Sequence, residues 1–257
     1  MTGVQTCALP ILSASAALAR SLRADAATLA ARFMMPPPLR ADAMADAFVA
    51  AVSSHTRIAI VDHIAAEAAV ILPLADIARR VKARGVAVLA DGAHAPGAVA
   101  LDVPALGVDW YVANLHKSAF VPRSSGFLWA APDRQTGLHP TVISWGLDEG
   151  FTKEFDSVGT RDASAHLAAP AALAFIDSFG LEAILAHNHA LAWNGARMLA
   201  QTWGTSFDTP EALIGTMASV PLPESLGTSR DDAARLRDAL LFEDQIEVGV
   251  RDRKSVV

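Results

Sequence analysis

A histidine and a lysine stand just beyond a short apolar run in this sequence, in the segment VANLHKSAF at residues 112–120. The run ends at Ala113 and has the character of a buried strand, whereas His116 and Lys117 are polar. A lysine at a strand end is commonly a solvated surface residue. The alternative is that Lys117 anchors a cofactor covalently, because a lysine in a water-poor site has a lowered pKa and a nucleophilic amine.

Polar residues also follow two other apolar runs. Asp62 ends the run that begins at Arg57, and Asp91 ends the run that begins at Val86. In a parallel sheet the carboxyl ends of the strands meet at one edge, and ligands bind outside that edge. We therefore expect Asp62, Asp91 and residues 114–117 to converge on a site.

Apolar runs alternate with amphipathic segments over the first half of the chain. The sequence predicts strands at 57–62, 86–91, 109–113 and 126–131, and helices at 42–52 and 74–84. Continuous apolar strands separated by helices are typical of a sheet that is covered on both faces. The fold class we expect is therefore α/β, with a mostly parallel sheet and helices on both faces.

Helices are also predicted within 12–33, at the start of the chain. The pattern of strands and helices changes after residue 160, where helices are predicted at 163–179, 181–203 and 230–241, and strands at 217–222 and 245–250. The later elements are typical of a smaller α+β domain that is only partly present. We expect a partial large domain at residues 12–175 and a partial C-terminal small domain at 176–251.

Composition narrows the functional class. The chain has 257 residues and a net charge of -6, without a Lys/Arg-rich stretch, which argues against a nucleic-acid partner. No uninterrupted apolar run approaches the ~18–20 residues that span a bilayer. We expect no membrane association and a cytoplasmic location, and we assign no metal site.

Both ends of the chain have an unusual character. Residues 1–11 (MTGVQTCALPI) and 252–257 (DRKSVV) resemble translated sequencing adapters, so we expect the gene-derived sequence to be an internal fragment of about residues 12–251. The single cysteine, Cys7, lies in the first of these tails, and one cysteine forms no internal disulfide.

Three motifs occur together in this order: ADGAHAPG at 90–97, NLHK at 114–117 and GTRD at 159–162, with Lys117 placed 26 positions after Asp91. Together they resemble the class V aminotransferase family of fold-type I pyridoxal-phosphate enzymes, and within it the isopenicillin N epimerase-like branch. The resemblance covers most of residues 35–251. It implies the large domain of that fold, incomplete at its N-terminal side.

The resemblance implies pyridoxal 5'-phosphate as the cofactor, with Lys117 forming its internal aldimine and moving the proton at the substrate α-carbon. Asp91 would pair with the pyridinium nitrogen, since a carboxylate keeps that nitrogen protonated. His94 matches the position that bonds the cofactor's ring oxygen. Two other readings stay open: Asp91 as a helix cap and His94 as a polar core residue.

The same resemblance implies how the phosphate is held. Asn114 and His116 match positions that contact the phosphate, and Gly159 and Thr160 match a segment that reaches it across a dimer interface. A homodimer is therefore expected for the full-length enzyme. The alternative for residues 159–160 is an ordinary loop.

The substrate side is less defined. Arg123 and Arg161 are candidates for binding a substrate carboxylate, although solvated or ion-paired arginines are commoner. The hydroxyl-bearing stretch that many relatives have after the strand at 57–62 is Ala65-Ala66-Glu67-Ala68 here. Nothing before residue 35 matches the family's ring-stacking and phosphate-binding residues, and its arginine for the α-carboxylate would lie beyond the end of the chain.

The resemblance implies an enzyme that acts on an amino-acid-like substrate as an epimerase or an aminotransferase. The alternatives are a lyase or desulfurase-like enzyme that breaks a C–S bond, and an inactive truncated fragment that does not bind the cofactor. A persulfide mechanism is disfavoured because Cys7 lies in the suspected tail.

Overall fold

A computed structural model describes residues 40–143, 145–156, 159–227, 229–251 and 255–256 of the chain. The described residues divide into two compact units. The first holds residues 41–64 and 72–181, and the second holds residue 40, residues 65–71 and the chain from residue 182 onward. The helices predicted within 12–33 lie outside the described residues.

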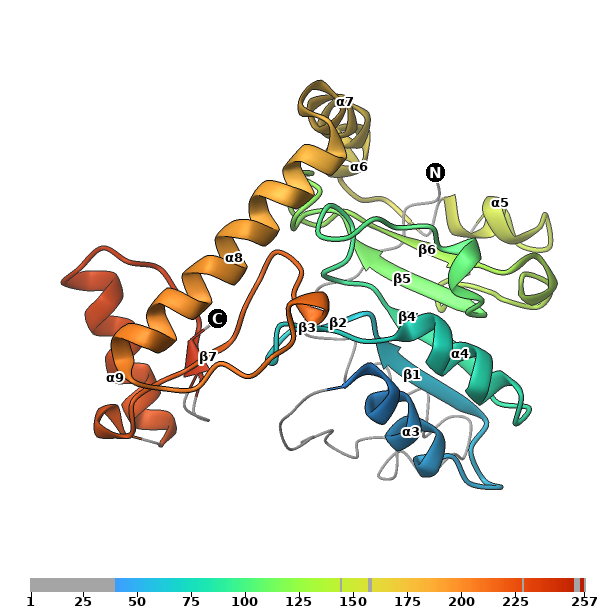
Figure 1. The fold of residues 1–257 in the computed structure, drawn as a ribbon. Coiled ribbons are helices and arrows are strands. Elements are labelled where there is room, and N and C mark those ends of the chain that lie inside the picture. Colours follow the sequence, from blue (N-terminus) through green and yellow to red (C-terminus); the bar gives the residue numbers. More distant parts are fainter. Residues whose placement is uncertain (1–39, 144, 157–158, 228, 252–254, 257) are drawn as a thin grey trace. The chain divides into compact units, whose positions relative to one another are not determined.

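A four-stranded sheet forms the centre of the first unit (Figure 1). Its strands, in spatial order, are β1 (Ile58–Asp62), β4 (Ala87–Asp91), β5 (Trp110–Asn114) and β6 (Gly126–Ala130). β1, β4 and β5 run parallel, whereas β6 pairs with β5 antiparallel. The prediction of a mostly parallel α/β sheet is confirmed.

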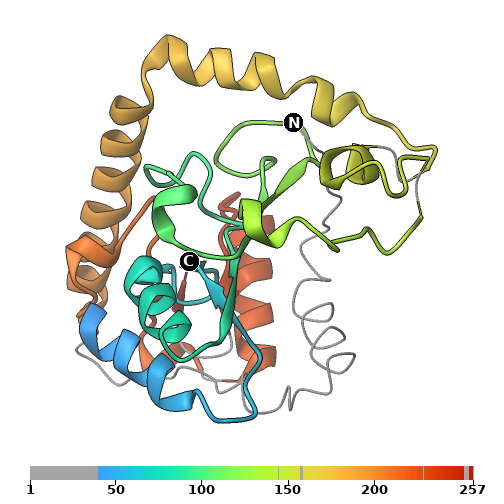
Figure 2. The same ribbon diagram turned by 90° about the vertical axis from the view of Figure 1, so that its right-hand side faces the viewer.

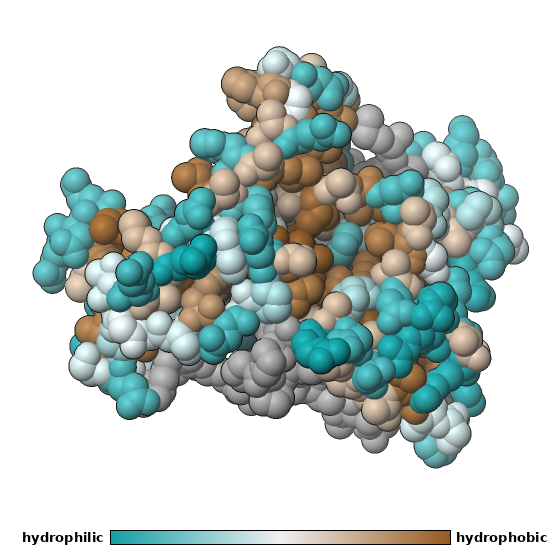
Figure 3. Space-filling model, viewed as in Figure 1, coloured by the Kyte–Doolittle hydropathy of each residue, from teal (hydrophilic) through white to brown (hydrophobic). Residues whose placement is uncertain are grey.

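Helix α4 (Leu74–Lys82) connects β1 to β4 and covers one face of this sheet. Its apolar side chains recur at helical spacing and are buried: Leu74, Ile77, Ala78 and Val81. Its outer side is hydrophilic (Figure 3). Helix α3 (Ala41–Ala51) lies beside α4 in both ribbon views (Figures 1 and 2), and an ion pair of 2.5 Å joins Arg80 to Asp46.

The two faces of the sheet differ in burial. Val61, Ala90 and Tyr111 are neighbours across β1, β4 and β5, and each is 0% exposed. Asp62, Asp91 and Val112 form the next row, which points to the other face. That row is only partly buried, so the polar strand ends lie on the more accessible face.

Short elements of the first unit follow the strands of its sheet. They are the 3-10 turns η1 (Pro104–Leu106) and η2 (Pro132–Arg134), and the helices α5 (Phe151–Asp156), α6 (Ser164–Leu167) and α7 (Ala169–Phe179). The strands β2 (Ile64–Ala65) and β3 (Val70–Ile71) form a separate two-stranded sheet. The helix predicted at 163–179 is therefore two helices. Pro170 explains the break, because proline favours the first turn of a new helix over a helix interior.

The second unit contains a long helix and a small sheet. Its elements are α8 (Leu181–Trp203), η3 (Glu211–Leu213), β7 (Val220–Pro221), η4 (Glu224–Leu226), α9 (Arg230–Phe242), β8 (Val250–Arg251) and β9 (Ser255–Val256). The three strands are antiparallel, in the order β7-β9-β8. A capping box of Ser229 and Asp232 begins α9.

The strand predicted at 245–250 is wrong over most of its length, since β8 begins only at Val250. Gln245 has a φ of 59°, which lies outside the strand region. The Ile246 amide donates to the Leu240 carbonyl at 2.7 Å, so this segment completes the end of α9.

Among the described residues, no single helix has both the length and the hydropathy of a membrane span. By length and composition alone, the bent pair Ser164–Phe179 and Leu181–Trp203 would together reach that threshold.

Candidate active site

The two segments expected to meet at the edge of the sheet do so. Lys117, three residues past the end of β5, places its Nζ 2.8 Å from Nε2 of His94, in the turn that follows β4. Asp91 ends β4 and is close enough for its charge to act on Lys117. The structure therefore brings the acid, the imidazole and the amine together at the carboxyl ends of two parallel strands.

Burial alters the protonation of the lysine and the histidine. Burial lowers the pKa of the half-buried Lys117, and the nearby Asp91 carboxylate opposes that shift. Burial and, to a smaller extent, the Lys117 charge lower the pKa of His94 to about 4. His94 is therefore neutral near pH 7, and its Nε2 shares a hydrogen bond with the lysine Nζ.

Asp91 combines a local contact with an unfavourable charge environment. Its Oδ1 accepts the Ala93 N–H at 2.9 Å, as in a turn stabilised by an aspartate. No helix begins at this turn, so Asp91 does not cap one. Burial raises the pKa of Asp91, while the Ala93 N–H and the Lys117 charge lower it less. Among the described residues, Oδ2 has no hydrogen-bond partner.

Asp62 adds a second carboxyl to this edge, as its position at the end of β1 predicted. It pairs in register with Asp91 in the sheet. Its side chain is accessible from the open edge, yet the surrounding protein and the Asp91 charge raise its pKa to about 6. This edge of the sheet thus carries two carboxyl groups, those of Asp62 and Asp91, and one lysine amine, that of Lys117.

Asn114 and His116 flank the lysine on the same strand end. Asn114 is 0% exposed. The Nδ1 of His116 donates to the Ser125 carbonyl at 2.9 Å, which fixes the ring against the start of β6. Both residues are therefore held in place around Lys117, although their contact with a phosphate stays a prediction.

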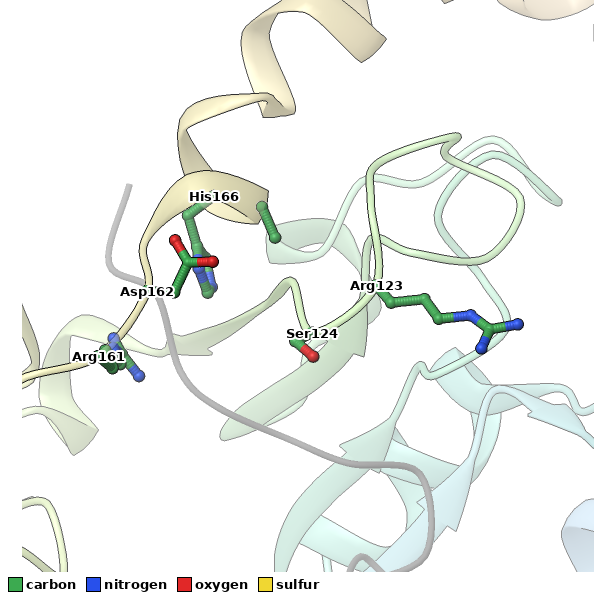
Figure 4. A pocket seen from close by; sticks show the side chains of 6 residues that line it. Arg123, Ser124, Arg161, Asp162 and His166 are labelled. Carbon is green, nitrogen blue, oxygen red and sulfur yellow. The ribbon is translucent and has the colours of Figure 1, made fainter.

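The two candidate arginines line a separate pocket of about 270 Å³ (Figure 4). Its lining residues are Arg123, Ser124, Arg161, Asp162, Ala165 and His166. In Figure 4 the Arg123 side chain points away from Asp162 and His166. Because Lys117, His94 and Asp91 are not among the lining residues, a role for these arginines toward a substrate stays a prediction.

Gly159 and Thr160 immediately precede Arg161, and both are exposed. Gly159 has a φ of 126°, a conformation that side-chain-bearing residues rarely adopt. The glycine of this motif is therefore required by the backbone. Its exposed position leaves it available to another molecule.

Sequence reasoning missed Tyr111, the single tyrosine of the chain. It is fully buried, and its hydroxyl lies 2.8 Å from Nδ1 of His63, which is 7% exposed. A signal was available, because a buried tyrosine hydroxyl needs a partner. Among the described residues, no group of three His, Cys, Asp or Glu side chains is arranged to hold a metal ion.

A family model for class-V aminotransferases matches residues 26–236 of the chain. The chain is 37% identical over 200 residues to putative L-cysteine desulfhydrase 1 of Oryza sativa subsp. japonica, and this alignment covers 76% of the chain and 42% of that protein. It is 34% identical over 225 residues to isopenicillin N epimerase of Streptomyces clavuligerus, covering 80% of this chain and 55% of that protein. The chain thus spans about half the length of the curated relatives it matches.

Solved structures show the same fold at low sequence identity. Alanine–glyoxylate aminotransferase from Nostoc sp. superposes with a TM-score of 0.65 at 18% identity, covering 82% of this chain and 58% of that one. The apo cysteine desulfurase from Thermococcus onnurineus NA1 gives a TM-score of 0.64 at 16% identity, covering 82% and 52%. These likenesses show the fold-type I aminotransferase fold.

Proposed function

Because the chain belongs to the aminotransferase class-V family, whose members are pyridoxal-phosphate enzymes, we propose that it derives from an enzyme that uses this cofactor on an amino acid. We further propose that Lys117 binds the cofactor covalently. The observation that carries the proposal is the 2.8 Å contact of Lys117 with His94, beside Asp91 at the neighbouring strand end.

The residues present fit the cofactor. A pyridoxal carbonyl needs a neutral amine, and burial lowers the pKa of Lys117 toward that state. A pyridine nitrogen needs a carboxylate, and Oδ2 of Asp91 has no partner among the described residues. A phenolic ring oxygen needs a donor or acceptor within reach of the lysine, and His94 supplies an imidazole there.

When bound, the cofactor would supply an electron sink for the substrate α-carbon. Asp91 would hold the proton on the ring nitrogen and so sustain that property. Lys117 would act as the base that removes the α-proton and as the acid that returns it. His94 would orient the lysine amine, since its Nε2 and the lysine Nζ share a hydrogen bond in this structure.

The fate of the substrate after the α-proton leaves defines the reaction. Return of the proton to the opposite face is epimerisation, and return to the cofactor leads to transamination. Loss of the sulfur substituent from cysteine as sulfide is a lyase reaction that requires no cysteine on the enzyme. The relatives named desulfhydrases favour the lyase outcome and those named epimerases favour epimerisation, so both are candidates.

We also propose that the full-length enzyme is a homodimer in which Gly159 and Thr160 approach the cofactor phosphate of the partner. Their exposure in this chain supports that arrangement.

Spectroscopy tests the role of Lys117. The chain is mixed with pyridoxal 5'-phosphate, reduced with borohydride and analysed for the absorbance of the lysine-bound cofactor and for the modified peptide. We expect the band and the modification with the unmodified chain and with Lys153→Ala, and neither with Lys117→Ala. Lys153 is a suitable control because it lies on α5 and its side chain is exposed.

Modification elsewhere in the chain, or a band that persists in Lys117→Ala, would overturn the proposed anchor. Absence of any band with the unmodified chain would support the inactive-fragment alternative. Sulfide release from L-cysteine, compared with α-proton exchange of other amino acids in D2O, then separates the lyase from the epimerase.

A further inference from the structure

The turn Asp91–Ala93, here called the Asp91 turn, is fastened to the neighbouring strands by backbone bonds. The His63 N–H donates to the Asp91 carbonyl at 2.8 Å, and the Gly92 N–H donates to the Val112 carbonyl at 2.7 Å. The Asp91 side chain closes the turn by accepting the Ala93 N–H. The orientation of the carboxylate therefore depends on where these strands hold the turn.

The phenol of Tyr111 packs directly against this turn. A Cβ placed on Gly92 would lie 2.2 Å from Cε1, Cζ and the hydroxyl oxygen of Tyr111, closer than any tolerated contact. Gly92 is therefore the residue type that lets the ring approach the backbone. The position of the ring and the position of the turn determine each other.

His63 holds the phenol at its hydroxyl group. The Tyr111 hydroxyl and Nδ1 of His63 share a hydrogen bond of 2.8 Å, and the two rings meet edge to face with centroids 5.9 Å apart. Since His63 also donates its backbone N–H to Asp91, the histidine contacts both the turn and the ring that supports it. The three residues form one connected unit beside Asp91.

This support carries no charge of its own near pH 7. Burial lowers the pKa of His63, and burial together with the Asp91 carboxylate raises the pKa of Tyr111. A neutral support leaves Lys117 as the cation that acts on Asp91.

We propose that His63 and Tyr111 are positioning residues for Asp91: the bond between them holds the phenol against Gly92 and thereby fixes the carboxylate in the orientation that would meet the cofactor's ring nitrogen. The ligand named here rests on the proposed function. The fixing of the turn does not, and it is measurable without cofactor.

Hydrogen exchange on the cofactor-free chain tests the support itself. The Ala93 amide reports on the turn, and the Val88 amide, bonded to Asp109 at 2.8 Å at the other end of β4, is the internal reference. In Tyr111→Phe, which keeps the ring and removes the hydroxyl, we expect Ala93 to exchange about 10-fold faster, the factor that one lost buried hydrogen bond allows. Val88 should be unchanged.

Two further variants separate positioning from general stability. His63→Leu should reproduce the effect, whereas His63→Asn should restore slow exchange, because its amide reaches the place of Nδ1. Ser125→Ala removes another buried hydroxyl bond, to the Pro122 carbonyl at 2.8 Å, and should leave Ala93 unaffected. Unchanged Ala93 exchange in Tyr111→Phe, or equal acceleration of Ala93 and Val88, would overturn the proposal.

Cofactor affinity supplies the second readout. Tyr111→Phe should raise the Kd for pyridoxal 5'-phosphate about 3- to 10-fold, and should add nothing in an Asp91→Asn background, because it acts through that carboxylate. Additive losses would refute the coupling. Failure of the proposed function would instead show as loss of cofactor binding in every variant, with the exchange pattern intact.

Discussion

Asp91 and Asp109 lie at opposite ends of two adjacent strands, β4 and β5, and the same residue type has a different environment at each end. Asp109 is 1% exposed, and half-exposed cations reach it from the surface. It accepts the Val88 N–H at 2.8 Å and Nε of Arg134 at 2.7 Å, and Nζ of Lys82 lies 3.3 Å away. The negative charge of the Asp109 carboxylate is therefore balanced by one backbone N–H and two cationic side chains.

The pKa values move in opposite directions for this reason. Burial would raise the pKa of Asp109, but the bonds from Val88 and Arg134 and the charges of Arg134 and Lys82 bring it below its ordinary value. Burial raises the pKa of Asp91, and its partners only partly offset that effect. A buried acid with complete partners stabilises the fold, whereas one left partly compensated is suited to receive a ligand.

A matched pair of substitutions gives the largest expected contrast. Asp109→Asn should lower the free energy of unfolding by about 1–3 kcal/mol, because charge-assisted bonds are lost. Asp91→Asn should change it by less than about 1 kcal/mol, since the amide oxygen still accepts from Ala93 and the fold disfavours the charge. Urea unfolding measures both variants.

The cofactor titration should give the reverse order. Affinity for pyridoxal 5'-phosphate should fall at least about 10-fold in Asp91→Asn and stay unchanged in Asp109→Asn. Equal destabilisation by the two substitutions would remove the distinction between the two ends of the sheet.

Acid unfolding should separate the same two regions by pH. The folded-state pKa of His94 is about 4, below its ordinary 6.5, so between these values the unfolded chain binds a proton that the folded chain does not. The His94 contribution to stability should therefore fall as the pH drops from about 6.5 to about 4. The raised pKa of Asp62, about 6, acts in the opposite sense, because there the folded chain holds a proton that the unfolded chain lacks. The Asp109 contribution should be lost only at lower pH, as its depressed pKa is crossed.

The unfolding free energy measured against pH for the unmodified chain and His94→Leu tests this assignment. The variant should show a smaller decline in the upper window and the same decline below it. His63, whose pKa is also lowered, should contribute a slope of the same sign in the upper window. Asp62 and Asp91, whose pKa values are raised, should contribute slopes of the opposite sign. If the unfolding free energies of the two proteins changed in parallel with pH above pH 4, the lowered pKa assigned to His94 would be wrong.

The smallest expected effect is the mutual influence of Asp91 and Lys117, which is the weakest contribution to each pKa. Lys117→Met should raise the pKa of Asp91 further, and Asp91→Asn should lower the pKa of Lys117 further. Carboxyl NMR titration follows the first, and the pH dependence of lysine acylation follows the second. A shift of either group in the opposite direction would contradict the assigned charges.

The polar strand ends were predictable because the signal is local. Asp62, Asp91 and Lys117 each follow an apolar run, and parallel strands bring such ends together whatever lies between them. The mostly parallel sheet followed from the same pattern. At Pro170 and Gln245 the local backbone conformation sets where a helix or strand ends, and there the predicted boundaries differ from the observed ones.

Contacts between distant residues were not predictable. His63 and Tyr111 are 48 positions apart, and Tyr111 looked like one more apolar residue of a buried strand. The pocket that Arg123 and Arg161 share depends on how the loop before β6 and the segment before α6 fold, which apolar periodicity does not specify.

The missing side chain at Gly92 has a consequence for protein engineering. Because the phenol of Tyr111 fills the volume that a methyl group would need, positions 92 and 111 behave as one combined choice of residue. A mutant library that varies either position alone would sample mostly clashes or empty space. Randomising the two together, with smaller residues at 111 allowed beside alanine at 92, would explore sequences that no single substitution reaches.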